Sequence, residues 1–138
     1  MPDSSNIDNA LIAKLASDST LLALCPNGVY WAEAPPVSTR FVIVSFVESH
    51  DEQMFGGRAF EMPHYTVKAV MRSNAGGNIQ AAAARIDVLL EQQPLTVTGY
   101  TVTCVRRVSP IRETEVDDLD EAIRWQHRGG VYEVTASS

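Results

Sequence analysis

Positive charge is scarce in this sequence. Lysine occurs only as Lys14 and Lys68, and the arginines are scattered, so that 17 acidic residues leave a formal net charge of -6. Holding a nucleic acid tightly requires clustered lysine and arginine to neutralise its phosphates. The composition therefore argues against DNA or RNA as a tightly bound ligand, although an acidic protein can still lie next to DNA that it does not hold.

Cysteine and long apolar runs are also scarce. Cys25 and Cys104 are far apart, with no C-x-x-C motif, which favours two small buried thiols in a reducing compartment over a disulfide framework. The first residues lack the basic start and apolar stretch of a signal peptide, and no run approaches the roughly 20 apolar residues of a membrane span. We therefore expect a cytosolic protein, made and used inside a cell, with no membrane partner.

Familiar catalytic and phosphate-binding motifs are missing too. The glycine pairs at 56–57 and 76–77 fit neither G-x-x-x-x-G-K-[S/T] nor G-x-G-x-x-G, and no G-x-S-x-G elbow occurs. His50, Asp51 and Glu52 adjoin one another, but neighbours on a strand point to opposite sides, which suits metal binding poorly. We expect no enzymatic activity, no cofactor and no metal.

What the sequence does contain is a regular alternation of helical and strand patterns. At 138 residues and 45% hydrophobic, the chain suits one domain over residues 1–138. The patterns predict a helix over 7–24 with a break near 17–19, strands over 29–34, 40–50 and 59–72, a helix over 78–92, and strands over 100–108 and 122–136. Pro110 either ends the strand over 100–108 or bulges it, in which case 111–116 extends it. Hairpin-like spacing between strands favours an α+β fold, an antiparallel sheet with two helices packed on one face. The pair Gly129-Gly130 predicts a β-bulge in the last strand.

Two segments are candidate interaction sites. The polar connection over 51–58, with Phe55, Gly56, Gly57 and Arg58, has no core periodicity, so we expect a mobile hairpin tip. The second segment is an acidic run from Glu113 to Glu121. Its carboxylates repel one another and favour a solvated surface over a packed core; they belong to Glu113, Glu115, Asp117, Asp118, Asp120 and Glu121.

The order of these motifs resembles the tail-completion, or tail-terminator, family of long-tailed bacteriophages and prophages. The similarity runs over nearly the full length. It covers an A-L-I-A-K-L helix, V-Y-W-A-E-A-P-P, F-V-I-V-S-F, F-G-G-R-A-F-E, Y-T-V-K-A-V, A-A-A-A-R-I-D-V-L-L, P-L-T-V-T-G-Y-T-V and R-W-Q-H-R-G-G-V-Y-E-V. Each motif alone is unspecific, and it is their order and spacing that resemble the family.

The resemblance implies a structural virion protein without catalytic residues. Its subunits would form a ring, usually a hexamer, that caps the tail tube at the end facing the head. The ring would contact the major tail tube protein and head-completion proteins of the neck, and DNA would pass through it. Alternatives are a head–tail joining or stopper protein of the same neck, or, in a different class, a small cytosolic ligand-binding module or enzyme.

Within such a ring the acidic run has three candidate locations. At the lumen it would repel passing phosphate. On the outer rim it would be a plain solvated loop. Between subunits it would pair with arginines of a neighbour, for which Arg106, Arg107 and Arg112 are candidates.

Overall fold

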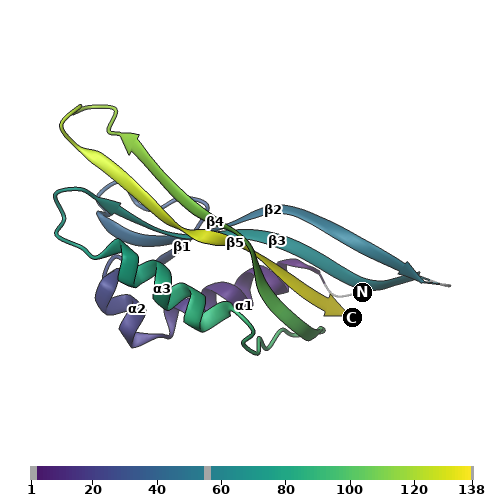
Figure 1. Ribbon diagram of the computed structural model, residues 1–138. Helices are drawn as coiled ribbons and strands as arrows, with labels where there is room; N and C mark the ends of the chain where they lie inside the picture. Colours follow the sequence, from purple (N-terminus) through teal and green to yellow (C-terminus); the bar gives the residue numbers. More distant parts are fainter. Residues whose placement is uncertain (1–2, 55–56, 138) are drawn as a thin grey trace.

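The computed structural model describes residues 3–54 and 57–137 and contains three helices and five strands among them (Figure 1). The helices are α1 (Ser5–Ala16), α2 (Ser19–Leu24) and α3 (Ile79–Leu90). The strands are β1 (Val29–Trp31), β2 (Arg40–Met54), β3 (Gly57–Arg72), β4 (Thr101–Val116) and β5 (Arg124–Ser137). The predicted α+β class is thus confirmed, and the main helices and strands lie where the sequence patterns predicted them.

The strands form one mixed sheet in the order β1-β2-β3-β5-β4. The expectation of a purely antiparallel sheet is wrong at its edge, because β1 runs parallel to β2, with Val29 opposite Val42 and Trp31 opposite Val44. After β1 the chain turns at Ala32, whose φ is 62°, and the link over 32–39 returns it to the start of β2. A strand pattern encodes which residues are extended but not the direction of the strand, so the sequence could not reveal this.

The expectation of two helices is also inexact, because the segment over 7–24 forms two helices with the predicted break between them. Ser17 caps the end of the first, and Asp18 caps the start of the second: its Oδ2 accepts a hydrogen bond from the Leu21 backbone N–H at 2.8 Å. Both Asp18 carboxylate oxygens also accept from Arg85 of α3, at 2.9 and 2.7 Å. This bidentate pair holds α2 against α3.

The hydrophobic core lies between the helices and one face of the sheet (Figure 1). Alternate residues of each strand point into it, as a pleated strand requires. The sheet contributes Val42, Val44, Tyr65, Val67, Ala69, Met71, Val105, Tyr132, Val134 and Ala136, and the helices contribute Ile7, Leu11, Leu15, Leu21, Ala82, Ile86 and Leu90. The face that carries Phe41, Ile43, Lys68 and Val70 looks away from the helices.

Two buried tyrosines at the centre of the sheet tie the helices to it. Tyr65 and Tyr132 are direct cross-strand partners on β3 and β5, and both are almost fully buried. The Tyr65 hydroxyl donates to Asp8 of α1, and the Tyr132 hydroxyl donates to Asp87 of α3 at 2.9 Å. Burial, reinforced by these carboxylates, raises the pKa of both phenols. The phenols therefore remain protonated donors.

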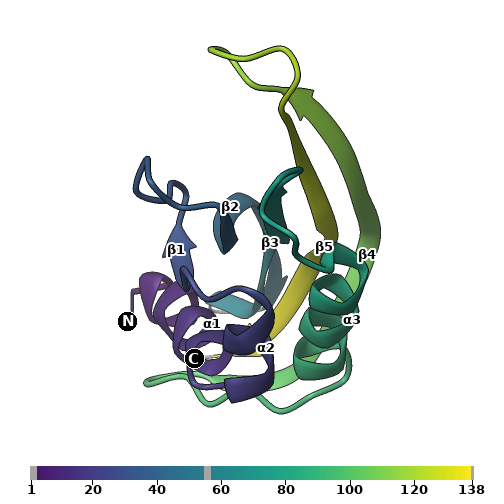
Figure 2. The ribbon, with the colours of Figure 1, turned by 90° about the vertical axis from the view of Figure 1, so that its left-hand side faces the viewer.

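The two long hairpins extend beyond the helices at opposite ends of the sheet (Figure 1). The segment over 51–58, expected to be a polar connection, is mostly ladder: Asp51 pairs with Glu61, and Met54 pairs with Gly57. At the other end, the tip of the β4–β5 hairpin stands clear of the helices (Figure 2). The helices cover the middle of the sheet and leave both hairpin ends outside the core.

Register shifts interrupt the ladders of β2 with β3 and of β4 with β5. They include one in β2 between Phe46 and Glu48, and one in β4 between Arg107 and Ser109. No shift occurs at Gly129 or Gly130, so the bulge predicted there is wrong; it lies on the neighbouring strand β4. The glycine at 129 serves close packing, because a Cβ there would lie 2.1 Å from the Val67 carbonyl oxygen and 2.6 Å from Lys68 Cα.

Substituting Gly129 with alanine is expected to destabilise the protein by about 2 kcal/mol or more, since the clash is with backbone that cannot rotate away. Equilibrium unfolding in denaturant measures the change. Gly76→Ala is the matched control: nothing lies within 4 Å of its added Cβ, so that its cost comes only from the positive φ of 73°. Equal effects of the two substitutions would contradict the close-packing account.

Candidate interaction surfaces

The acidic run lies at the tip of the β4–β5 hairpin. Glu113–Val116 form the last residues of β4, and residues 117–123 form the connection to β5. This tip is the part of the molecule farthest from the helices in Figure 2. Hairpin geometry therefore concentrates the carboxylates at one end of the molecule.

Two carboxylates of the run accept hydrogen bonds within the turn. Asp117 accepts hydrogen bonds from the Leu119 and Asp120 backbone N–H groups at 3.0 and 3.1 Å, and from Trp125 Nε1 at 2.8 Å. Asp120 accepts from the Ala122 N–H at 2.9 Å. The Trp125 bond, then the backbone bonds, hold the pKa of Asp117 below its ordinary value. These two carboxylates shape the tip.

The remaining carboxylates divide into one that is paired and three that are not. Glu115 Oε1 lies 2.8 Å from His127 Nε2 across the ladder. Glu113, Asp118 and Glu121 are exposed, and within the described part of the chain their side chains make no hydrogen bond or ion pair. At the apex, Leu119 is 98% exposed. An apolar side chain thus stands among free carboxylates.

The second candidate segment lies at the other end of the sheet. Phe55 and Gly56 fall outside the described residues, whereas Gly57 and Arg58 begin β3 and pair with Met54 and Gln53. The structure therefore does not bring the two sequence-predicted groups together: they occupy opposite hairpin ends (Figure 1). A partner that contacts one group meets a different end of the molecule from a partner that contacts the other.

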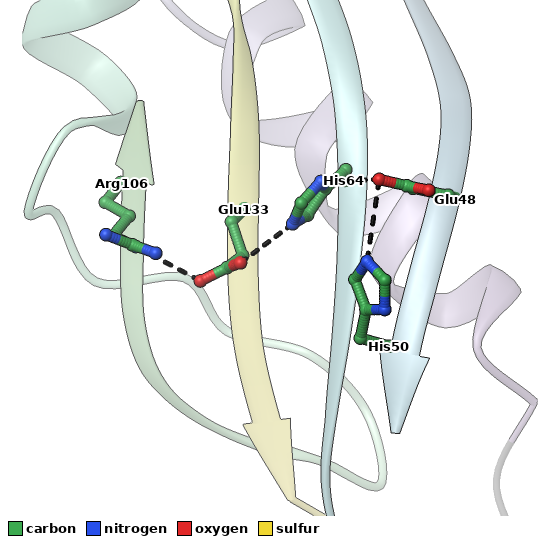
Figure 3. Close-up of polar contacts among 5 residues, drawn as sticks. All are labelled: Glu48, His50, His64, Arg106 and Glu133. Carbon is green, nitrogen blue, oxygen red and sulfur yellow. Dashed lines mark hydrogen bonds and ion pairs between the residues drawn. The ribbon is translucent and has the colours of Figure 1, made fainter. Parts of the chain in front are cut away.

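A polar row that the sequence analysis missed crosses four strands on the face away from the helices (Figure 3). Arg106 Nε donates to Glu133 Oε1 at 3.1 Å, and His64 Nε2 lies 2.7 Å from Glu133 Oε2. His64 Nδ1 and His50 Nε2 each lie 3.5 Å from Glu48 Oε1. The row joins β4, β5, β3 and β2 by alternating basic and acidic groups.

Glu133 is the most constrained carboxylate of this row. Its side chain is only 12% exposed, and that of His64 is 13% exposed. Burial opposes the ionisation of Glu133, but hydrogen bonds from His64 and Arg106 outweigh it and lower the pKa of Glu133. The row depends on strand register, which brings residues from four separate segments together. The sequence signal was limited to polar residues at alternating strand positions.

A shallow hollow lies on the same face, between the link over 32–38 and the sheet. Its lining mixes the apolar side chains of Phe41 and Trp125 with Lys68 and His127. The rings of Phe41 and Trp125 lie 6.2 Å apart, and His127 Nδ1 is buried without a hydrogen-bond partner in the described structure. The hollow adjoins the acidic tip through Glu115.

Neither cysteine forms a disulfide. Cys25 is buried, and burial raises the pKa of its thiol to about 11, whereas Cys104 is only half-buried on β4. No group of three or more metal-binding side chains comes together within the described ranges. No helix among the described residues has the length and apolar character needed to cross a membrane.

No protein-family model matches the chain, and no curated protein sequence matches it. Solved structures do match its fold. A chain from the virion of a native gene transfer agent particle superposes with a TM-score of 0.70, over 96% of this chain and 95% of that chain, at 15% identity. A second solved protein, which carries no functional name, matches with a TM-score of 0.62 over 100% and 97%, also at 15% identity. The chain therefore shares its whole fold with a virion component.

Asp117→Ala should loosen the tip without unfolding the sheet, because Asp117 accepts hydrogen bonds only from the turn and from Trp125. Hydrogen exchange of the Leu119 and Asp120 amides is expected to accelerate several-fold, while exchange in β3 stays unchanged. The folded pKa of Asp117 lies below 3.8, so wild type should lose this protection as pH falls through that folded value. Asp118→Ala is the matched control, and equal acceleration by it would contradict the assignment.

Glu133→Gln should lower the free energy of unfolding at pH 7 by about 1–2 kcal/mol, because two charge-assisted hydrogen bonds weaken. Because the folded pKa of Glu133 lies below its ordinary value of 4.5, its contribution is complete above pH 4.5 and is lost as pH falls through the folded pKa. Denaturant unfolding at pH 7 and at pH 3 measures the difference, which should shrink at pH 3. Glu48→Gln, an exposed position in the same row, should cost less than about 0.5 kcal/mol.

Proposed function

We propose that this chain is a structural subunit of a tailed virion or a related particle. The observation that carries the proposal is the match of nearly the whole chain, with a TM-score of 0.70, to a chain from the virion of a gene transfer agent particle. The match covers 95% of that chain, so that it spans the whole subunit rather than a shared motif. The order of sequence motifs, which resembles the tail-completion family, supports the same class of protein independently.

Within the virion, we propose that the chain is the tail terminator. Several copies, six in the family it resembles, would form a ring at the head-facing end of the tail tube. The ring would stop tube growth by contacting the major tail tube protein on one side and a head-completion protein on the other. Two hairpin ends at opposite ends of one sheet support this role, because a subunit between two layers needs a contact surface toward each.

DNA would pass through the ring without being held. The net charge of -6 supports this, because attraction of phosphate requires an excess of positive charge along the channel. We propose no catalytic step for the chain. Its work would be mechanical: ending a polymer and joining two parts of a particle.

Deleting the gene in a strain that makes the particle tests the terminator role. The expected result is tail tubes of uncontrolled length and heads without tails, seen by negative-stain microscopy, with complementation restoring normal particles. Tails of normal length beside heads that fail to join would instead support the stopper alternative. Normal, infective or transducing particles in the deletion strain would overturn a virion role altogether.

A further inference from the structure

A hollow rich in arginine lies between α3 and the β4–β5 hairpin, on the helix side of the sheet. Arg107, Arg112 and Arg128 line it together with the apolar residues Ala83 and Pro110. Arg106, which the sequence analysis grouped with Arg107 and Arg112, is not part of it, because its side chain pairs with Glu133 on the opposite face. The third arginine of the hollow is therefore Arg128 and not Arg106.

Among the described residues, little negative charge offsets the positive charge of this hollow. Arg112 and Arg128 are direct cross-strand partners, an arrangement of like charges that destabilises a sheet. Neither side chain makes a hydrogen bond or ion pair with any described residue. The one carboxylate that lines the hollow belongs to Asp87, which accepts a hydrogen bond from Tyr132. Three arginines thus face one carboxylate, in a chain whose net charge is -6.

The tip of the β4–β5 hairpin has the complementary chemistry. Leu119 stands at its apex, fully exposed, and is flanked by Asp118 and Glu121, whose carboxylates are free of partners in the described structure. Asp117 and Asp120 hold the turn that presents them. The tip therefore offers an apolar knob framed by negative charge, and the hollow offers an apolar lining framed by positive charge.

The tip of a chain cannot enter its own hollow. The hollow lies along the middle of the β4–β5 ladder, and the tip is the end of that same ladder, pointing away from the helices (Figures 1 and 2). The partner with matching chemistry is a second copy of the chain. A nucleic acid is a poorer match, because its phosphates would bind the arginines but would make no favourable contact with the apolar lining.

We propose that the hollow of one copy receives the β4–β5 tip of a second copy. Leu119 would lie against Pro110 and Ala83, and Asp118 and Glu121 would pair with Arg112 and Arg128. The contact rests on the proposed function, since it supplies the subunit interface of the ring. Knob and hollow are different surfaces, so the contact is head-to-tail and leads to a ring if the rotation closes.

Complementary charge reversal tests the contact. One variant reverses the tip (Asp118→Lys with Glu121→Lys), and the other reverses the hollow (Arg112→Glu with Arg128→Glu). None of these four side chains makes a hydrogen bond or ion pair with a described residue, so both variants should fold as wild type does, which thermal melting checks. Self-association is followed by sedimentation velocity up to about 1 mM chain, the range in which weak contacts are populated.

Each reversed variant alone should associate at least about tenfold more weakly than wild type, because like charges then meet at the contact. An equimolar mixture should recover association, since each basic tip finds an acidic hollow and each acidic tip finds a basic one. Raising the salt concentration should weaken the wild-type contact, because exposed charges are screened. Glu33→Lys, an exposed change on the other face of the sheet, should have no effect.

Three results would overturn the contact: a wild-type chain that is monomeric at about 1 mM, reversed variants that associate normally, or a mixture that does not recover. If the hollow variant instead loses binding to a single-stranded oligonucleotide and associates as wild type does, the arginines serve nucleic acid and the contact is wrong. If both reversed variants restore normal particles to the deletion strain, the contact fails while the virion role stands. Failure of the virion role is seen separately, as normal particles without the chain.

Discussion

The structure depends on two buried phenol–carboxylate bonds at the centre of the sheet. Tyr65 and Tyr132 face each other across β3 and β5, and each donates to an aspartate on a different helix. A half-buried carboxylate is stabilised when a donor meets it, so Asp8 and Asp87 help to fix where α1 and α3 lie. The helices are thereby confined to the middle of strands that reach 16 residues in length.

Because the helices cover only the middle of the strands, different interactions determine the conformation of the middle and of the ends of the molecule. In the middle, the pleat alternates between core and exposed face, and packing determines conformation. At the β4–β5 tip no core is available, and hydrogen bonds of Asp117 and Asp120 determine conformation instead. The fold depends on which part of the strands the helices cover more than on the identity of the covering residues. This is consistent with a shared fold at 15% identity.

Much of this architecture could be predicted from local patterns. Alternation placed Tyr65, Val67 and Ala69 on one face of β3, and Ser17–Ser19 marked the break between α1 and α2, because both signals lie within a few residues. The parallel direction of β1 and the continuation of β2 to Met54 could not be predicted, because both depend on pairing.

The candidate sites were harder to predict for a related reason. The acidic run was visible as composition, yet Asp117 has its role from Trp125, which returns on the next strand. The polar row of Glu48, His64, Arg106 and Glu133 exists only in the folded register, and so does the facing of Arg112 and Arg128. Charged residues in a sequence indicate a charged surface, but strand pairing determines which charged side chains lie next to one another.

Register shifts occur in β4, which is an edge strand, and in β2, which β1 pairs with only from Val42 to Val44, and they limit how copies of the chain associate at high local concentration. A flat, unpaired strand edge is a template on which further chains add without limit. Here β2 is bulged between Phe46 and Glu48, and β4 is bulged between Arg107 and Ser109. The β4 edge is also occupied by its own loop, since the Gln92 N–H donates to the Val105 carbonyl and Glu91 accepts from the Arg107 N–H. Edge-to-edge stacking of copies into fibres is thus disfavoured when the chain is crowded during synthesis. Side-chain contacts then determine how the copies associate.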